Sequence, residues 1–518
     1  MRVFLSANER CFLEAVSELA GCNPFLPERT RCERAALGRD FVEGEHVWSL
    51  PVDDPEKPRA NVWRVVERLE PLVAQLRERL SAGAKASPRD LVLYEDGVLH
   101  WMYQRYYIHF FHASFGAEAA QAGRGRWRFY RDFCADWERF FNFDHAIPQN
   151  RSDPARTFAF CRQIQRAFEQ IFRDIIGNSL PAARLRGAIW QSIFTHDLRR
   201  YQRSLFERMG DFVTLITGPS GTGKELVARA IAQARYAPFD EHNLSFADDE
   251  AGTFFPINVS ALSPTLVESE LFGHRRGSFT GAIGDRKGWL ETCPALGSVF
   301  LDELGDLDPA IQVKLLRVIE TRTFHPVGDT ASRQFQGKII AATNRDLEAG
   351  IRYCGFREDL YYRLCSDQIA TPSLAEQLAD SPGVLRELVV YMAKRVAGAE
   401  AEEFAPEVTV WIEENLGMGY SWPGNYRELE QCVRNVLIRS NYRPARSKAV
   451  PADPLDRIAD DFRAGRLTAE ELLSRYCTIM YAKTGSYEEA ARRLQIDRRT
   501  VKSKVNAELL NELQAGTR

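Results

Sequence analysis

Hydrophobic and polar positions follow different periods in different parts of the chain. Residues 61–80, NVWRVVERLEPLVAQLRERL, place apolar side chains three and four positions apart with charges between them, which predicts an amphipathic helix. Residues 81–87 are rich in Gly, Ala and Ser and end that pattern, and dense aromatic zones follow at 101–115 and 126–145. From 174 to 372, short β-branched runs alternate with helical stretches. This alternation predicts a parallel α/β sheet.

The changes of pattern also predict the domain organisation, because 518 residues are too many for one hydrophobic core. We expect a multidomain protein with these parts: a mostly α-helical N-terminal domain at 1–172, an α/β core at 173–372, a helical region at 373–440, a linker rich in proline and charge at 441–466, and an all-α C-terminal domain at 467–518.

Composition restricts the class of protein. The hydrophobic fraction of 45%, the charged fraction of 27% and the net charge of -3 are ordinary for globular protein and leave room only for a local basic patch. The ten cysteines form no CxxC pair, which favours free thiols over a disulfide framework or a zinc site. No run approaches the ~20 apolar residues that span a bilayer, and charges come too early for a secretory signal. We therefore expect a cytoplasmic protein that does not act at a membrane.

A phosphate-binding loop is predicted at residues 215–225, LITGPSGTGKE. An apolar strand leads into a glycine-rich loop and a lysine that opens a helix, so backbone N–H groups and the lysine would face phosphate oxygens. The residues that would hold the nucleotide are Gly218, Pro219, Ser220, Gly221, Thr222, Gly223, Lys224 and Glu225. Glu225 stands where Ser or Thr usually contacts magnesium, and a glycine-rich turn without a ligand is the alternative.

Acidic and amide side chains end two further predicted strands. SVFLDE ends in Asp302 and Glu303, of which Asp302 would bind Mg²⁺ and Glu303 would polarise the attacking water. KIIAATN ends in Asn344, which would position that water or sense the γ-phosphate, and is otherwise a turn asparagine. Arg357 and Arg363 in GFREDLYYRL either solvate a helix face or reach across a subunit boundary to a transition state.

Residues 273–282, GHRRGSFTGA, predict a flexible loop that offers an aromatic side chain to solvent. Glycines flank the Phe-Thr pair and a basic cluster precedes it. A mobile surface loop with an incidental phenylalanine is the alternative interpretation. The glycine-flanked part of this loop comprises Gly277, Ser278, Phe279, Thr280, Gly281 and Ala282.

The C-terminal segment 484–505, TGSYEEAARRLQIDRRTVKSKV, predicts a helix-turn-helix. Ser486 and Glu489 form a capping-box pattern, Ala490 and Ala491 supply a small buried face, and Asp497 would cap the second helix. A basic helix is often only a solvated face, but this order favours a recognition helix in a DNA major groove. The candidate DNA-binding residues are Arg498, Arg499, Thr500, Lys502, Ser503 and Lys504.

Taken together, residues 175–440 resemble the AAA+ domain of the sigma-54-dependent transcription activators, the bacterial enhancer-binding proteins. The matching segments are GPSGTGKE, ESELFGHRRGSFTGA, FLDELGDL, QVKLLRVIE, AATNRDLE, FREDLYYRL and WPGNYREL. The C-terminal domain resembles the Fis-type helix-turn-helix that ends these activators.

The resemblance implies a function and assigns several residues. By resemblance, the chain would bind ATP and Mg²⁺, hydrolyse ATP in a hexameric ring, and remodel the sigma-54 RNA polymerase promoter complex from double-stranded DNA upstream. Asn258 would pair with Glu303, Arg357 and Arg363 would act as fingers in trans, and Arg427 would be the sensor of the helical lid at 373–440. The loop Gly277–Ala282 would contact sigma-54.

The chain departs from the family pattern at three places. Ser278 replaces an alanine, residues 365–387 diverge where the lid begins, and residues 196–211 are additional. The N-terminal domain shows no receiver pattern, and His100, His109, His112 and His145 are interpreted as packing residues rather than metal ligands.

Three other functions are left open by the residues. These are a DNA-binding AAA+ regulator that acts independently of sigma-54, a remodelling ATPase for an unrelated protein, and a P-loop metabolic kinase. The Phe-Thr loop argues against the first, the helix-turn-helix against the second, and Asn344, the paired arginines and the lid sensor against the third.

Overall fold

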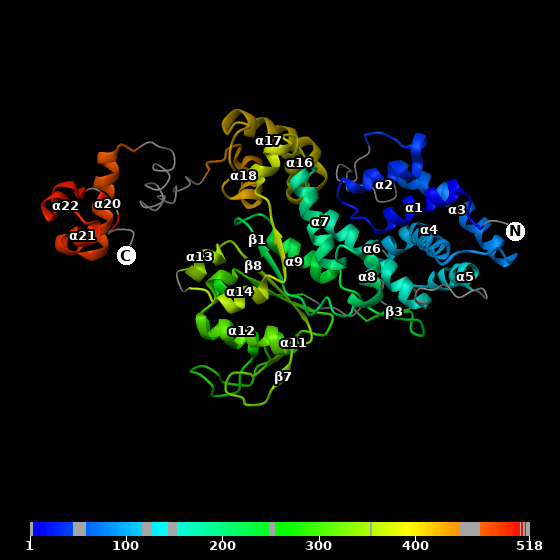
Figure 1. Cartoon of the computed structure of the whole chain (residues 1–518), viewed down its shortest axis with the longest axis horizontal. Helices are drawn as coiled ribbons and strands as arrows, with labels where there is room; N and C mark the ends of the chain where they lie inside the picture. Colours follow the sequence, from blue (N-terminus) through cyan, green and yellow to red (C-terminus); the bar gives the residue numbers. More distant parts are fainter. Residues whose placement is uncertain are drawn as a thin grey trace. The chain divides into compact units, whose positions relative to one another are not determined.

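The structure is a computed structural model that describes residues 4–44, 59–116, 126–142, 153–247, 254–352, 355–444, 467–507, 509–510 and 513. Most of the predicted linker and His145 lie outside these residues. The chain divides into two compact units, Met1–Ile438 and Arg439–Arg518 (Figure 1). The sequence prediction of a multidomain, mostly helical protein around a parallel α/β sheet is confirmed.

In its described residues the first unit begins with seven α-helices: α1 (Ala7–Gly21), α2 (Glu28–Leu37), α3 (Ala60–Ser81), α4 (Pro88–Phe115), α5 (Tyr130–Phe141), α6 (Pro154–Asp174) and α7 (Leu180–Phe194). Side-chain caps explain where several of them start. Ser6 and Ser87 close capping boxes, and Asp153 and Ser179 accept a backbone N–H just before a proline in the first turn. Helix α3 agrees with its sequence prediction to one residue at each end. Among the described helices, none is long and apolar enough to cross a membrane.

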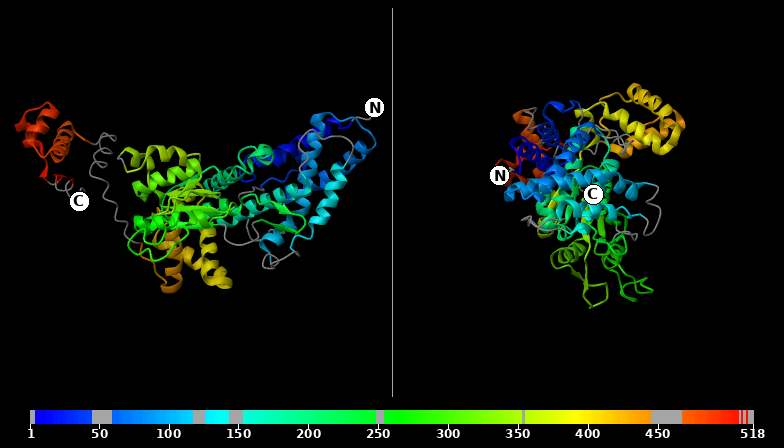
Figure 2. Two further views of the ribbon diagram at one scale, coloured as in Figure 1. Left: turned by 90° about the horizontal axis from the view of Figure 1, so that it is seen from below. Right: turned by 90° about the vertical axis from the view of Figure 1, so that its right-hand side faces the viewer.

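Helix α6 belongs to two hydrophobic cores. Phe158 packs with Phe110, Tyr130 and Phe133 of the N-terminal helices, whereas Phe160 joins the core that contains the strands of the sheet. The predicted domain boundary at 172/173 therefore falls inside the last turn of this helix. Figure 2 shows the N-terminal helices continuing through α6 and α7 into the core.

The central sheet is parallel, with strand order β4-β5-β8-β1-β9. The strands are β1 (Thr214–Thr217), β4 (Phe254–Asn258), β5 (Ser298–Asp302), β8 (Lys338–Thr343) and β9 (Asp367–Ala370). Every residue of β8 is buried, as expected for a central strand covered on both faces. Two small antiparallel hairpins that the sequence pattern does not predict are β2 (Phe239–Asp240) with β3 (Ser245–Phe246), and β6 (Thr323–Phe324) with β7 (Arg333–Gln334).

Helices cover the sheet and extend beyond it. Around the sheet lie α8 (Leu198–Arg200) with a π-helical turn at Tyr201–Leu205, α9 (Lys224–Gln233), α10 (Pro264–Phe272), α11 (Trp289–Thr292), α12 (Pro309–Thr321), α13 (Leu347–Arg352) and α14 (Glu358–Leu364). The helical region after the sheet comprises α15 (Leu374–Asp380), α16 (Val384–Ala397), α17 (Ala401–Asn415) and α18 (Asn425–Arg439). The second unit contains α20 (Ala469–Thr484), α21 (Tyr487–Leu494) and α22 (Arg498–Lys504), packed around Cys477, Ala490, Ala491 and Val501.

Candidate nucleotide site and surface loop

The glycine-rich loop between β1 and α9 is folded as the sequence predicts. Gly218, Gly221 and Gly223 have φ angles of 142°, 77° and 88°, which residues with a Cβ rarely adopt. The Lys224 ammonium donates to the carbonyl oxygens of Gly218 at 3.0 Å and Pro219 at 3.1 Å. Burial lowers the pKa of Lys224, and the neighbouring carboxylates Glu303 and Asp302 oppose that shift. The loop is thus wrapped around a cation, as a phosphate site requires.

Residues from beyond the sheet clasp this loop. The Asn425 side-chain amide donates to the Ser220 carbonyl at 2.9 Å, and the Tyr426 N–H donates to the Gly221 carbonyl at 3.1 Å. A Cβ on Gly221 would lie 2.3 Å from the Gly424 carbonyl oxygen. The helical region after the sheet therefore contacts the loop backbone directly.

Two residues that contact the loop, Thr371 and Asn425, were not predicted from the sequence. The Thr371 hydroxyl lies 2.6 Å from the Thr222 hydroxyl, and a Cβ on Gly218 would lie 2.2 Å from the Thr371 Oγ1. Asn425 has a φ of 52°, and the Gly-Asn pair at the start of α18 is a sequence signal for such a turn. Thr371 lies in the segment that diverges from the family pattern, so no motif pointed to it.

Asp302 ends β5 at the carboxyl edge of the sheet and Glu303 follows it; β8 lies between β5 and β1. Burial raises the pKa of Asp302, and the Glu303 N–H donates to its Oδ1 at 3.0 Å. Glu303 has a φ of 55°, and its Oε2 is buried without a hydrogen-bond partner among the described residues. Backbone strain and an unpaired buried oxygen are typical of a side chain that acts on a bound ligand, and Glu303 combines both near Lys224.

The same pair of carboxylates fits a magnesium nucleotide. No group of three or more His, Cys, Asp or Glu side chains able to hold a metal occurs in the described part of the chain. A magnesium ion at Asp302 would consequently need phosphate oxygens and water to complete its octahedral shell, as Mg²⁺ sites in nucleotide-binding proteins do.

The two predicted asparagines occupy different environments. The Asn258 Oδ1 accepts from the Ser260 N–H at 3.0 Å, the Ser260 hydroxyl at 2.8 Å and the Ala261 N–H at 3.2 Å. Asn258 is paired in register with Asp302, yet none of its hydrogen bonds in the described structure goes to Glu303. Asn344 is exposed directly after β8.

The three predicted arginines are all exposed, and only Arg427 lies at this site. Its Cβ lies 3.2 Å from a Cβ built on Gly221, and its charge acts, after burial and nearer groups, on the pKa values of Lys224 and Asp302. Arg357 forms a two-bond ion pair with Asp359 at 2.6 and 3.0 Å, and Arg363 pairs with Glu320 at 3.1 Å. Within one chain, both arginines therefore form ion pairs with acidic residues at the surface.

The loop 277–282 is a hydrogen-bonded turn, which corrects the expectation of an exposed aromatic tip. Its backbone bonds include Gly277 N–H to the Ala282 carbonyl at 2.9 Å and Ala282 N–H to the Phe279 carbonyl at 3.0 Å. Phe279 is half-buried against the His274 ring, 4.9 Å between centroids. Ile283, directly after the loop, is 88% exposed. The apolar side chain presented to solvent is therefore Ile283, a position that the glycine pattern did not indicate.

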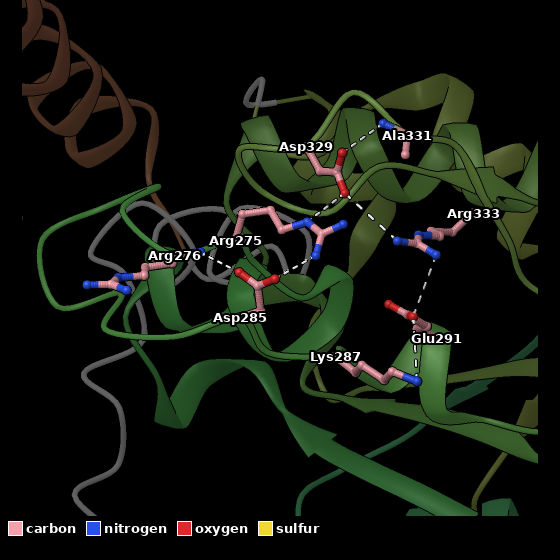
Figure 3. A network of polar contacts seen from close by, with 8 residues as sticks. All are labelled: Arg275, Arg276, Asp285, Lys287, Glu291, Asp329, Ala331 and Arg333. Atoms are coloured by element: carbon pink, nitrogen blue, oxygen red, sulfur yellow. Dashed lines mark hydrogen bonds and ion pairs between the residues drawn. The ribbon is translucent and has the colours of Figure 1, made fainter.

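An ion-pair network holds the base of this loop (Figure 3). Arg275 donates to Asp285 at 2.6 Å and to Asp329 at 2.9 Å, which joins the loop to the turn between β6 and β7. Asp285 also accepts from the Arg276 N–H at 2.8 Å, while the Arg276 side chain points away from the network. Backbone donation from Arg276 and the Arg275 guanidinium lower the pKa of Asp285.

The C-terminal helices place most of their predicted basic residues on the surface. Asp497 caps α22, as expected, whereas Ser486 caps α21 without the reciprocal bond from Glu489. Arg499 and Lys502 are exposed and unpaired among the described residues, and Ser503 is also exposed. Arg498 pairs with Glu488 at 2.9 Å and half-buried Lys504 with Glu470 at 2.5 Å, while Thr500 is half-buried.

The aromatic zones and histidines of the N-terminal helices are packing residues, as predicted. His100 is buried, with its Nε2 unpartnered, and burial lowers its pKa to about 4. His109 packs against the rings of Tyr106 and Phe129.

Comparison with known proteins agrees with the motifs of the central region. Residues 195–370 match the family described as Sigma-54 interaction domain. The chain is similar to a Nif-specific regulatory protein of Herbaspirillum seropedicae (38% identity, 48% of this chain, 46% of the relative). It is also similar to the transcriptional regulatory protein GlrR of Escherichia coli strain K12 (38% identity, 52% of this chain, 57% of the relative). The resemblance to sigma-54-dependent activators drawn from the motifs is confirmed for this region.

The chain spans about half the length of these curated relatives. Among solved structures it is similar to NtrX from Brucella abortus in complex with ADP, at 24% identity and a TM-score of 0.39, over 71% of this chain and 79% of that one.

Proposed function

We propose that this chain is an ATP-hydrolysing transcription activator that acts on the sigma-54 RNA polymerase promoter complex. One observation carries the proposal. The glycine-rich loop around Lys224, the orphaned carboxylate of Glu303 and the clasp from Asn425 meet at one edge of the sheet, and most of them belong to the segment similar to sigma-54 interaction domains.

The geometry supports a division of chemical roles. Loop N–H groups of residues 218–225 and the Lys224 ammonium would bind the phosphates, and Asp302 would hold Mg²⁺, which neutralises charge on the β- and γ-phosphates when bound. Glu303 would accept the proton of the attacking water, with Asn344 orienting that water. Arg427 would contact the nucleotide from the same chain.

Hydrolysis in this scheme requires a second subunit. Arg357 and Arg363 would leave Asp359 and Glu320 and stabilise transition-state charge in a neighbouring site. We therefore infer a ring as the active assembly, with six subunits as in the family it resembles.

A short stretch of chain links the nucleotide site to the loop 277–282. Asn258 caps the turn Val259–Ala261, which leads into α10, and α10 ends at Phe272, shortly before the loop. If Asn258 exchanged its bonds at Ser260 and Ala261 for one to Glu303, this turn would lose its cap and α10 would be free to shift. Nucleotide state would thereby reposition Gly277, Ser278, Phe279, Thr280, Gly281 and Ala282 against sigma-54.

We assign DNA binding and regulation to the two ends of the chain. Residues 467–518 would bind double-stranded DNA as a helix-turn-helix, with Arg498, Arg499, Thr500, Lys502, Ser503 and Lys504 of α22 at the DNA and residues 441–466 as the linker. Lys504 would first have to release Glu470. Residues 1–172 would be a regulatory domain.

Gel filtration of the purified chain with sigma-54, in ADP plus a metal fluoride, tests this function. We expect a nucleotide-dependent complex that is lost in Thr280→Ala, while the variant still hydrolyses ATP.

Glu303→Gln should bind ATP and hydrolyse it poorly, and Lys224→Ala should lose nucleotide binding. An active ATPase that forms no complex would instead identify a DNA-binding regulator independent of sigma-54.

A further inference from the structure

A cavity of about 530 Å³ lies at the opposite edge of the sheet from the nucleotide site. We call it the basal cavity, because its lining includes Lys338, the first residue of β8, and Gly210 and Asp211, just before β1. Helix α6, the additional segment 196–211 and the end of α9 complete its walls. Its volume is within the range of small-molecule sites, and none of the residues 218–225 contributes to it.

Three cations line the basal cavity without carboxylate partners. Lys338 donates to the carbonyls of Met209 at 3.2 Å and Phe212 at 2.8 Å, and Arg235 donates to those of Ala295 and Gly297. The third, Arg156, donates to the Gln202 carbonyl, and its Nε is buried without a partner. In the described chain none of the three forms an ion pair.

The three cations of the basal cavity are more buried than its acidic residues. Its acidic lining residues, Asp153, Glu207 and Asp211, are exposed, and Asp211 is paired with Arg322 at 3.3 Å. Burial lowers the pKa of Lys338 to about 8; the nearby carboxylate of Asp367 opposes this shift, and the charges of Arg235 and Arg322 add to it. A bound anion would supply the missing counter-charge.

Aromatic rings form another wall. The rings of Phe206 and Tyr236 meet at 4.7 Å between centroids, and Phe239 also lines the basal cavity. The Arg156 guanidinium lies 4.5 Å from the Phe206 centroid, so one end of the site combines a cation with aromatic surface. Such a wall favours a flat apolar ring attached to the anionic group.

We propose that the basal cavity binds a small aromatic carboxylate, with the carboxylate at Arg156, Arg235 and Lys338 and the ring against Phe206 and Tyr236. The additional segment 196–211 then has a role, since it builds one wall of the site. Ile231 of α9 and Arg235, two residues after its end, are also in the lining, and α9 begins at Lys224. A ligand here is thus positioned to alter nucleotide binding, and nucleotide would alter its affinity by the same factor.

Isothermal titration of the full chain with benzoate tests the site without nucleotide or sigma-54, so its outcome is independent of the proposed function. Benzyl alcohol supplies the ring without the charge, and inorganic phosphate supplies the charge without the ring. We expect benzoate to bind at least about tenfold more tightly than either, because hydrogen bonds to charged groups contribute that much.

Two matched variants locate the binding. Arg156→Gln should weaken benzoate binding about tenfold. The control is Arg173→Gln. Arg173 lies on α6 like Arg156, but it is stacked 4.4 Å from Phe115, outside the basal cavity, so its replacement should leave benzoate binding unchanged. Circular dichroism of both variants confirms that they fold. The proposal is overturned if benzoate fails to bind at millimolar concentration, if benzyl alcohol or phosphate binds as well, or if the two variants behave alike.

Discussion

Replacing Asn425 with alanine removes the side chain that joins the helical region to the phosphate-binding loop. Asn425 is 2% exposed, donates to the Ser220 carbonyl at 2.9 Å and accepts the Leu374 N–H at 2.8 Å. Losing both bonds and leaving their buried partners unpaired costs about 2 kcal/mol. Alanine at a φ of 52° adds about 1 kcal/mol of backbone strain. We expect Asn425→Ala to lower the stability of the first unit by about 3 kcal/mol.

Two further variants separate these contributions. Asn425→Gly tolerates the φ angle and should recover about 1 kcal/mol while still lacking both bonds. Asn435→Ala, on the same helix, removes only a bond at 2.8 Å to the Gln431 carbonyl of its own helix and should change stability little.

The assay is urea unfolding, together with ADP titration followed by calorimetry. We expect ADP affinity to fall about tenfold in both Asn425 variants, because their loop carbonyls are no longer held in place before binding. If Asn425→Ala unfolds and binds ADP like Asn435→Ala, the clasp does not organise the site.

Three other substitutions test separate features. His100→Leu should abolish a loss of stability of about 3 kcal/mol between pH 6.5 and about 4, since the unfolded chain binds the proton at higher pH than buried His100 does. Urea unfolding at pH 7 and pH 4.5 measures this loss; an equal loss of unfolding free energy in the native chain and the variant would contradict the prediction. Ile283→Ser should weaken the sigma-54 complex in gel filtration and leave ATPase activity intact, because an 88% exposed side chain stabilises no core; an unchanged complex removes Ile283 from the contact. Arg275→Ala should change overall stability little but speed chymotrypsin cleavage after Phe279, as should high salt with the native chain; unchanged cleavage means the network does not restrain the loop.

Sequence periodicity was sufficient for the elements whose packing is local or repetitive. The apolar runs at 212–218, 299–303 and 338–344 contain the cores of β1, β5 and β8, because strands buried on both faces need continuous apolar sequence. The phosphate-binding loop was predictable because its glycines are imposed by backbone conformation.

Features that depend on how the chain turns back or on distant partners could not be predicted in this way. Phe279 was expected at the surface because its own neighbours are glycines, but His274 covers it after the chain turns back. Thr371 gains its role only because β9 is laid beside β1. The basal cavity likewise joins side chains from 153 to 338, whose proximity has no signature along the chain.

The sharing of α6 between two cores has a consequence for how such genes recombine. Phe158 and Phe160, two residues apart, face different cores, so a crossover within residues 154–174 would have to match two unrelated sets of packing partners at once. A foreign N-terminal domain grafted at residue 172 would bring its own helix and leave Phe239 and Phe246, which pack against Phe158, without that partner. The N-terminal region and the α/β core should therefore be inherited as one block, with exchange of modules confined to the segment beyond α18.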